Sequence, residues 1–427
     1  MNLPQYPRYE SYKDVGEGWI GEVPDHWDDR KLKHLFREKK HRANMGLNCG
    51  AISFGEVVEK DDERIPLSTK ASYQEVLTGE FLVNPLNLNY DLKSLRIGLS
   101  EIDVVVSAGY IVLQATSELD KRYYKYLLHR YDVANMKLLG SGVRQTISFN
   151  HISNSVLVAP PLAEQQAIAR FLDEKTNQID RAVKIKERQI ALLRERKQII
   201  IQAAVTKGLN PDVPMKDSGI SWIGHVPAHW DILPFTKYCA SQVDYRGKTP
   251  EKVEDGVLLV TAKNVRDGFL DYEVSREYIA PSNYEKVMSR GRPQKGDILF
   301  TTEAPLGKVA VVDDESVALA QRIIKFRLKP KLKSEYINFF LNSWGFQGNL
   351  VTMSTGSTAL GIKASKLHKL VVAAPPSGEQ LDIIEYLNDV SFRISETIEL
   401  KERQILTLEE YKTSLIDAAV TGKIKVT

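Results

Sequence analysis

The sequence has few cysteines and no long apolar run. Its only two cysteines, Cys49 and Cys239, form no CxxC pair, which excludes a disulfide framework and fits a reducing cytosol. No apolar stretch approaches the roughly 20 residues that cross a bilayer. The first residues, MNLPQYPRYESYKDVG, lack the basic start and apolar core of a secretory signal. We therefore expect a cytoplasmic protein with no membrane partner.

The sequence also lacks a strong charge of either sign. The formal net charge is +3 over 427 residues, of which 26% are charged, so charge alone does not indicate nucleic-acid binding. A slight excess of Lys and Arg within 28–158 and within 231–373 is only a weak indication. The length allows two or three domains.

The chain does contain a long internal repeat. APPLAEQQAIARFLDEKTNQID at 159–180 corresponds to APPSGEQLDIIEYLNDVSFRIS at 374–395, and both copies continue to a shared KERQI and AAVT. A second pair, KDVGEGWIGEVPDHW at 13–27 and KDSGISWIGHVPAHW at 216–230, precedes two segments that have diverged. Such a duplication predicts one scaffold that carries two different domains. Its segments are a strap (1–27), a variable domain (28–158), a long helix (159–209), a linker with a second strap (210–230), a second variable domain (231–373) and a distal helix with a tail (374–427).

The two repeated segments are predicted to be long helices. Pro160-Pro161 and Pro375-Pro376 mark their starts, and apolar residues then recur at spacings of three, four or seven, typical of a coiled-coil seam. At 1.5 Å per residue, about 44 residues make a rod of roughly 65 Å. Each helix needs a partner, and the other copy is the obvious one. Two seam positions are Lys in both copies, which can fix the register of the pair (Lys186 and Lys401, Lys197 and Lys412). Gly208 and Gly422 are expected to cap the two helices.

Three apparent motifs of catalysis or metal binding are incomplete. Gly247-Lys248-Thr249 resembles the end of a phosphate-binding loop, but Gln242 stands where its leading glycine belongs. Asp25 with Glu38-Lys39 matches a loose nuclease pattern, although Ala228 replaces Asp25 in the second copy. His225 and His229 have helical ligand spacing, but Pro227 between them argues against a helix. We interpret the Trp and His residues of the straps as packing anchors and expect no metal site.

These motifs carry a family resemblance. WIGEVP at 19–24, PPLAEQ at 160–165 and LDEKTNQID at 172–180, in duplicate around variable segments, resemble the specificity subunit of type I DNA restriction-modification systems. The second copy departs at Asn388 and in VSFRI. The resemblance implies an α+β fold with two mixed α/β target-recognition domains, joined by two long helices in an antiparallel coiled coil with an internal pseudo-twofold repeat.

The resemblance also implies a function and its partners. Each recognition domain would read one half of a bipartite site in double-stranded DNA, and because 28–158 and 231–373 differ, the two halves should differ. Two modification (methyltransferase) subunits would bring the chemistry, with S-adenosylmethionine as their cofactor, and restriction subunits would join them. We expect no cofactor and no catalytic residue in this chain.

Within the variable domains, short apolar runs predict strands, as in GDILFTT and IIKFRLK, whereas KRYYKYLLHRY and KSEYINFFLNSW predict helices. Loop residues that can bond bases or phosphates are the candidate DNA contacts. The loop 245–250, which also resembles an RGKTP-like stretch of the family, is the first choice. In the second domain the candidates are Tyr245, Arg246, Lys248, Thr249, Lys263, Asn264, Thr302, Gln321, Arg322 and Lys363. In the first domain they are Arg42, Asn44, Ser53, Asn84, Asn87, Asn89, Ser107, Arg144 and Gln145.

Two other functions stay open from the residues alone. A stand-alone DNA adenine methyltransferase would need an Asn/Asp-Pro-Pro-Tyr/Phe motif and a glycine-rich cofactor loop, but both Pro-Pro pairs here follow Ala in APPL and APPS. A coiled-coil adaptor that binds no DNA would share the long helices. The helices themselves are either passive structure or a ruler that separates the two domains.

Overall fold

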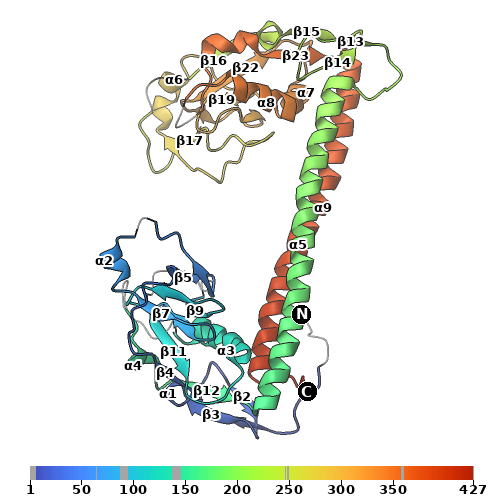
Figure 1. Cartoon of the computed structure of the whole chain (residues 1–427). Coiled ribbons are helices and arrows are strands. Elements are labelled where there is room, and N and C mark those ends of the chain that lie inside the picture. The colour runs from blue at the N-terminus through green and yellow to red at the C-terminus, as the bar shows by residue number, and fades with distance from the viewer. Residues whose placement is uncertain are drawn as a thin grey trace. The chain divides into compact units, whose positions relative to one another are not determined.

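The computed structural model describes residues 6–63, 65–86, 95–136, 146–245, 247, 250–356 and 360–426. The chain divides into two compact units, Met1–Lys186 with Arg403–Thr427 and Glu187–Glu402. Two long helices, α5 (Leu162–Lys207) and α9 (Ser377–Val420), each begin in one unit and end in the other. Figure 1 labels the elements of both units.

The first unit contains a six-stranded mixed sheet in the order β4-β11-β8-β9-β6-β5, a pair β7-β10 and a ribbon β3-β12. Its strands are β3 (Asp28–Lys31), β4 (Phe36–Glu38), β5 (Gly50–Ser53), β6 (Glu56–Glu59), β7 (Gln74–Val76), β8 (Phe81–Val83), β9 (Ile97–Leu99), β10 (Val104–Val106), β11 (Ile111–Ala115) and β12 (Val156–Ala159), and its shorter helices are α1 (Leu32–Leu35), α2 (Leu67–Lys70), α3 (Lys121–Ala134) and α4 (Phe149–Ile152).

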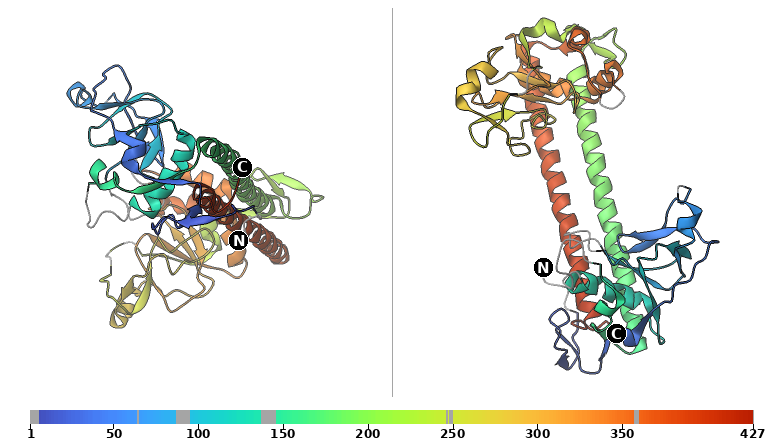
Figure 2. Two further views of the ribbon diagram at one scale, coloured as in Figure 1. Left: turned by 90° about the horizontal axis from the view of Figure 1, so that it is seen from below. Right: turned by 90° about the vertical axis from the view of Figure 1, so that its left-hand side faces the viewer.

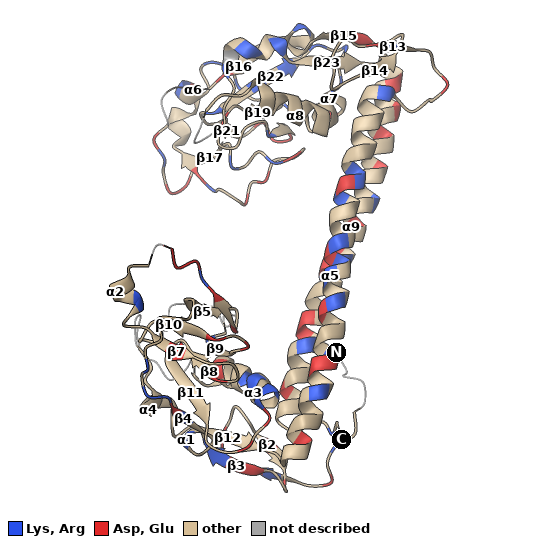
Figure 3. Ribbon diagram, viewed as in Figure 1, with Lys and Arg blue, Asp and Glu red and all other residues tan. Residues whose placement is uncertain are grey.

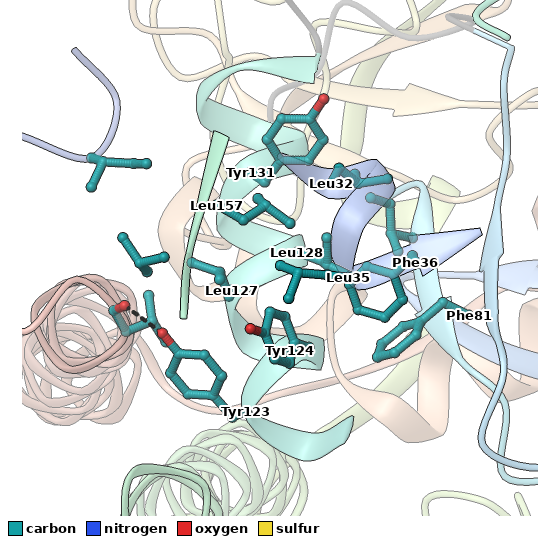
Figure 4. Close-up of a cluster of buried hydrophobic side chains, with 14 of the residues drawn as sticks. Leu32, Leu35, Phe36, Phe81, Tyr123, Tyr124, Leu127, Leu128, Tyr131 and Leu157 are labelled. Atoms are coloured by element: carbon teal, nitrogen blue, oxygen red, sulfur yellow. Dashed lines mark hydrogen bonds between the residues drawn. The ribbon is translucent and has the colours of Figure 1, made fainter. Parts of the chain in front are cut away.

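The core of this first domain lies between α3 and the sheet. Asp120 caps α3, since its carboxylate accepts the backbone N–H groups of Arg122 and Tyr123. The apolar face of α3 then packs on strand residues such as Phe36 and Phe81, as Figure 4 shows. In the same view the hydroxyl of Tyr123 reaches the end of α9, where it donates to the carbonyl of Val420 at 3.0 Å. This buried bond docks the domain on the long helix.

The second unit repeats this plan with different sheets. A four-stranded sheet runs β16-β22-β19-β20, a three-stranded sheet runs β18-β17-β21, and a ribbon pairs β15 with β23. Its elements are β15 (Asp231–Pro234), η2 (Phe235–Tyr238), β16 (Cys239–Asp244), β17 (Val257–Val260), β18 (Tyr278–Ile279), η3 (Pro281–Asn283), α6 (Tyr284–Val287), β19 (Ile298–Thr301), β20 (Val309–Val311), β21 (Ala318–Leu319), β22 (Ile323–Leu328), α7 (Ser334–Leu341), α8 (Trp344–Met353), η4 (Ala364–Lys369) and β23 (Val371–Ala374).

The second domain contacts the end of a long helix in the same way. The hydroxyl of Tyr336, on α7, donates to the carbonyl of Val205 near the end of α5 at 3.1 Å. Val205 and Val420 occupy equivalent places in the shared AAVT sequence. Both domains therefore use a fully buried tyrosine to hold the end of a long helix.

The two long helices run antiparallel within each unit. In the first unit Lys412 donates to Asp180 at 2.7 Å and Lys186 donates to Gln404 at 2.7 Å, so residue numbers rise along α5 while they fall along α9. In the second unit Lys401 donates to Gln189 at 2.7 Å. The predicted antiparallel helices are confirmed, and Figure 2 shows them side by side from two further directions.

Three of the four predicted seam lysines have polar partners across the seam. Lys186–Gln404 and Lys401–Gln189 are the same pair in the two copies of KERQI, so this layer has the symmetry of the repeat. The pair Lys412–Asp180 has no such counterpart, because Ser395 stands at the equivalent of Asp180. Burial lowers the pKa of Lys197, the equivalent of Lys412.

Each strap clasps the ends of both long helices in its own unit. The first strap is the hairpin β1 (Tyr12–Asp14) and β2 (Glu22–Pro24). The indole N–H of buried Trp27 donates to Glu164, in the first turn of α5, at 3.0 Å, and His26 Nε2 lies 2.6 Å from the other carboxylate oxygen. Gly422 ends α9 at φ +72°, where a Cβ would collide with Pro24. The left-handed cap predicted at Gly422 is therefore also a close approach.

The second strap repeats the clasp around β13 (Met215–Asp217) and β14 (His225–Pro227). Trp230 donates to Glu379 at 2.9 Å, and His229 Nε2 lies 2.5 Å from the same carboxylate. Gly208 ends α5 at φ +75° against the Trp230 ring. The strap tryptophans are packing anchors, as predicted, and they explain why the strap and the PPxxEQ start recur together.

We expect Glu164→Gln to destabilise the first unit at neutral pH. Burial raises the pKa of Glu164, but hydrogen bonds from Trp27, His26 and Tyr9 outweigh burial and hold it below its usual value. The ionised clasp therefore stabilises the fold above the unfolded pKa of about 4.3, and this contribution is lost as the pH falls through the lower folded pKa. The expected loss at pH 7 is about 1–3 kcal/mol.

Thermal unfolding at pH 7 and pH 3.5 checks this expectation. The melting temperature of the wild type should exceed that of Glu164→Gln at pH 7, and the gap should narrow at pH 3.5. Glu379→Gln is the matched variant and should cost less, because the Glu379 side chain is 39% exposed and that of Glu164 is 17% exposed. If wild type and Glu164→Gln differed in melting temperature by the same amount at both pH values, the ionised form of Glu164 would not be what stabilises the first unit.

Among the described residues, no helix is both long and apolar enough to cross a membrane.

Candidate nucleic-acid interface

Each variable domain begins and ends on its own two-stranded antiparallel ribbon. In the first, Asp28 pairs with Ala159 and Lys31 with Val156. In the second, Asp231 pairs with Ala374 and Pro234 with Val371. Entry and exit of each domain are thus adjacent, so a domain can diverge, or be exchanged, without moving the strap and the helix that flank it.

In the first domain, two candidate contacts meet at a buried carboxylate. The amide of Asn44 donates to Glu75 at 3.3 Å, and the exposed guanidinium of Arg42 lies 3.7 Å from the same carboxylate. Lys39 Nζ lies 3.3 Å from Glu75, and these groups together hold the pKa of Glu75 below its usual value against the opposing effect of burial. Glu75, which the sequence did not single out, also donates its backbone N–H to the carbonyl of Arg42 at 2.8 Å and so positions the Arg42 backbone.

Ser107 lies near this place. It follows β10, whose last residue, Val106, pairs with Gln74 beside Glu75. Ser53 is exposed at the end of β5. Asn84 accepts the backbone N–H of Leu86 at 3.0 Å, which is the local turn contact expected of an Asn in a loop. Of these three, Ser107 shares the neighbourhood of Arg42.

In the second domain, three candidates gather where separate segments meet. Thr302 donates its backbone N–H to the carbonyl of Arg322 at 2.9 Å, and Ile362 donates to the carbonyl of Thr302 at 3.0 Å, which places Lys363 next to them. Arg322 has φ +74° and its guanidinium lies 3.3 Å from Glu303. A side chain at positive φ is uncommon outside functional or strained turns, so Arg322 is held in a costly conformation. Lys263 is also exposed.

Three candidates in this domain, Thr302 among them, have buried side chains. Tyr245 is buried, its hydroxyl donates to the carbonyl of Gly291, and burial raises its pKa. Asn264 is fully buried, and its amide group bonds Thr261, Asp271 and Ser275. The Thr302 side chain is buried as well. Burial with satisfied hydrogen bonds argues against direct base contacts by these three.

Gln321 borders a hollow of about 630 Å³ in the second domain. Lys286 and Arg290 line the same hollow, and neither was a candidate. The remaining candidates lie outside the described residues and stay predictions: Arg246, Lys248, Thr249, Asn87, Asn89, Arg144 and Gln145. No group of three His, Cys, Asp or Glu side chains in the described ranges is placed to hold a metal ion.

A sequence profile described as the type I restriction modification DNA specificity domain matches residues 95–191 and 277–410, more than half of the chain. The MjaVIII specificity subunit of a type I restriction enzyme from Methanocaldococcus jannaschii is 26% identical over 280 residues, which are 64% of this chain and 63% of that relative. The putative MjaX specificity subunit from the same organism is 22% identical over 99% of both chains.

Two solved structures share the fold. A chain from a study of complex assembly and conformational transition of the type I R-M system has a TM-score of 0.69, with 15% identity, over 93% of this chain and 98% of that chain. The HsdS subunit from Thermoanaerobacter tengcongensis has a TM-score of 0.51, with 16% identity, over 94% of this chain and 98% of that chain.

Proposed function

The chain belongs to the type I restriction-modification DNA specificity family, and from this premise we propose that it reads a bipartite, asymmetric site in double-stranded DNA, with one half-site for each recognition domain. The observation that carries the proposal is that two domains docked on equivalent helix ends differ in their sheets, one six-stranded and the other four-stranded. Equivalent docking with unequal domains predicts two unequal half-sites.

The contacts proposed for this reading are exposed cations held by the fold. Arg42, whose backbone is positioned by Glu75, serves the first domain, and Arg322 with Lys363 serves the second. Arg is suited to bidentate contacts with guanine in the major groove, and Lys to phosphates. The buried Tyr245, Asn264 and Thr302 are not part of this set.

The proposed role in the complex is to position other subunits on DNA. The matching pairs Lys186–Gln404 and Lys401–Gln189 give the long helices the symmetry of the repeat, which supports two equivalent surfaces for two copies of one partner. We assign this partner as the modification subunit, which binds S-adenosylmethionine and transfers the methyl group. Restriction subunits would join the assembly. This chain supplies recognition and no catalysis.

Methylation mapping tests the proposal. Long-read sequencing of host DNA, with and without this chain, should reveal a methylated motif of two different half-sites with an unread gap, present only when the chain is expressed. A motif that persists without the chain would contradict the proposed function. A gel shift with DNA carrying the mapped motif, in the presence of the modification subunit, separates this function from an adaptor that binds no DNA.

A further inference from the structure

The second domain presents an exposed basic segment that no candidate list included. Residues 284–296 carry Lys286, Arg290, Arg292 and Lys295 against a single acidic residue, Glu285. All four cations are exposed. The segment begins at α6, where Figure 3 shows Lys and Arg in blue, and ends before β19. We call the four cations and the backbone between them the basic turn.

Side chains from the core of the domain form hydrogen bonds with the backbone of this turn. Lys325 Nζ donates to the carbonyl of Arg292 at 2.7 Å, and the guanidinium of Arg327 donates to the same oxygen at 3.2 Å. The hydroxyl of Tyr245 donates to the neighbouring carbonyl of Gly291. Two side chains of β22 and that of Tyr245, the residue after β16, thus fix two successive peptide groups.

A buried carboxylate completes this network. Asp297 lies 3.1 Å from Lys325 Nζ and 2.8 Å from Arg327 Nε, and it accepts the backbone N–H of Gln294 at 2.9 Å. The Lys325 side chain is only 2% exposed, and burial lowers its pKa. Buried ion pairs stabilise a fold poorly compared with apolar side chains of the same volume. A fixed position of the turn is what this network provides.

The first domain has a similar carboxylate at the corresponding turn. Glu80 accepts the backbone N–H of Leu77 at 2.9 Å, as Asp297 does from Gln294, and Lys39 lies 2.9 Å from Glu80. Lys39 directly follows β4, whereas Lys325 lies on β22. On the preceding strand β7 lies Glu75, which positions the backbone of the exposed Arg42. A buried carboxylate thus holds this turn in both domains, but the turn of the first domain, Leu77–Glu80, carries no Lys or Arg.

We propose that the basic turn of the second domain contacts the phosphates of the DNA backbone, and that Lys325, Arg327 and Tyr245 act as positioning residues that fix it. This inference rests on the proposed function, since it assigns one surface of the DNA-reading domain. Phosphates are the expected ligand because the DNA backbone carries a negative charge at every nucleotide, and the closely spaced Lys and Arg side chains of the basic turn can neutralise several of these charges. Arg292 is paired with the exposed Glu285, a contact that a phosphate can replace at little cost.

The test compares Lys286→Ala/Arg292→Ala with the wild type in the assembly with the modification subunits. Loss of two phosphate contacts should reduce the slope of log K against log salt by about 1–2 and weaken binding roughly tenfold near 0.15 M salt. Cognate and unrelated DNA should lose affinity by the same factor. Arg276→Ala is the matched control, since Arg276 is 59% exposed beside Glu273 and Arg292 is 61% exposed beside Glu285.

The outcomes separate this inference from the proposed function. If wild type shows no preference for the mapped motif, the proposed function fails. If wild type binds its motif and the double variant keeps the wild-type salt slope, the basic turn is not a phosphate contact. If the double variant fails to assemble with the modification subunits, the turn docks an acidic protein surface, and the inference is overturned.

Tyr245→Phe tests the positioning role, because it removes one donor and keeps the ring in the core. Amide hydrogen exchange at Gly291 and Arg292 should accelerate, and the salt slope should fall although every surface cation remains. A lower melting temperature with an unchanged salt slope would show that the Tyr245 hydroxyl is only structural, and no change in either would show that it does not position the turn. Lys325→Met should have a larger effect on the salt slope than Tyr245→Phe. If Lys325→Met does not fold, the comparison of Lys286→Ala/Arg292→Ala with wild type decides the inference.

Discussion

Replacing residues 28–158 by the corresponding segment of another specificity subunit is expected to change one half of the methylated motif completely and to leave the other half intact. The physical reason is the ribbon on which the domain begins and ends, where Asp28 pairs with Ala159 and Lys31 with Val156. The junctions lie side by side, so the strap that holds Glu164 and the start of α5 keeps its own contacts. Methylation mapping reads both halves in one experiment.

The matched exchange of residues 231–373 should change only the opposite half. Its junction ribbon is equivalent, with Asp231 paired to Ala374. Both chimaeras must first be shown to assemble with the modification subunits. A chimaera that assembles yet alters both half-sites, or methylates nothing, would show that the domains do not read DNA independently.

The spacing of apolar residues and the positions of the Pro-Pro pairs were enough to predict the two long helices of the scaffold. The apolar spacing after Pro160-Pro161 and Pro375-Pro376 predicted two long helices, which are α5 and α9. The strands expected from GDILFTT and IIKFRLK are β19 and β22, and the helix expected from KRYYKYLLHRY begins α3. The helix expected from KSEYINFFLNSW contains α7, which ends at Leu341, three residues before the predicted end. These elements are fixed by local sequence, so tertiary contacts did not have to be known.

The direction of polar side chains in the loops could not be predicted in the same way. The sequence predicts Asn264 as a loop residue whose amide can bond a base. In the structure Asn264 is fully buried, and its amide group accepts the backbone N–H of Thr261 and donates to the carbonyl of Asp271. Tyr245 follows a strand, and its ring lies in the core because that strand pairs with β22, almost 80 residues later in the chain. Conversely, Arg292 was missed because the residues that fix its turn, Lys325 and Arg327, come from that same distant strand.

Inserting four residues after Glu187 and four after Glu402 is expected to lengthen the unread gap of the motif by one or two base pairs and to preserve both half-sites. The two positions lie at the boundary of the units. Lys186–Gln404 falls on one side of the insertions and Gln189–Lys401 on the other, so both layers remain intact. Four helical residues add about 6 Å, against a rise of about 3.4 Å per base pair.

A two-residue insertion at the same positions is the control. Two residues turn a helix by roughly 200°, which moves the seam of each half away from its partner, whereas four residues turn it by only about 40° beyond one full turn. The shorter insertion should therefore cost stability and assembly, although it adds less length. If the four-residue variant assembles and methylates its original motif at full occupancy, then α5 and α9, with 46 and 44 residues, do not measure the gap. The spacing of the half-sites would in that case be set by contacts within the recognition domains, and the long helices would serve only to hold the partners.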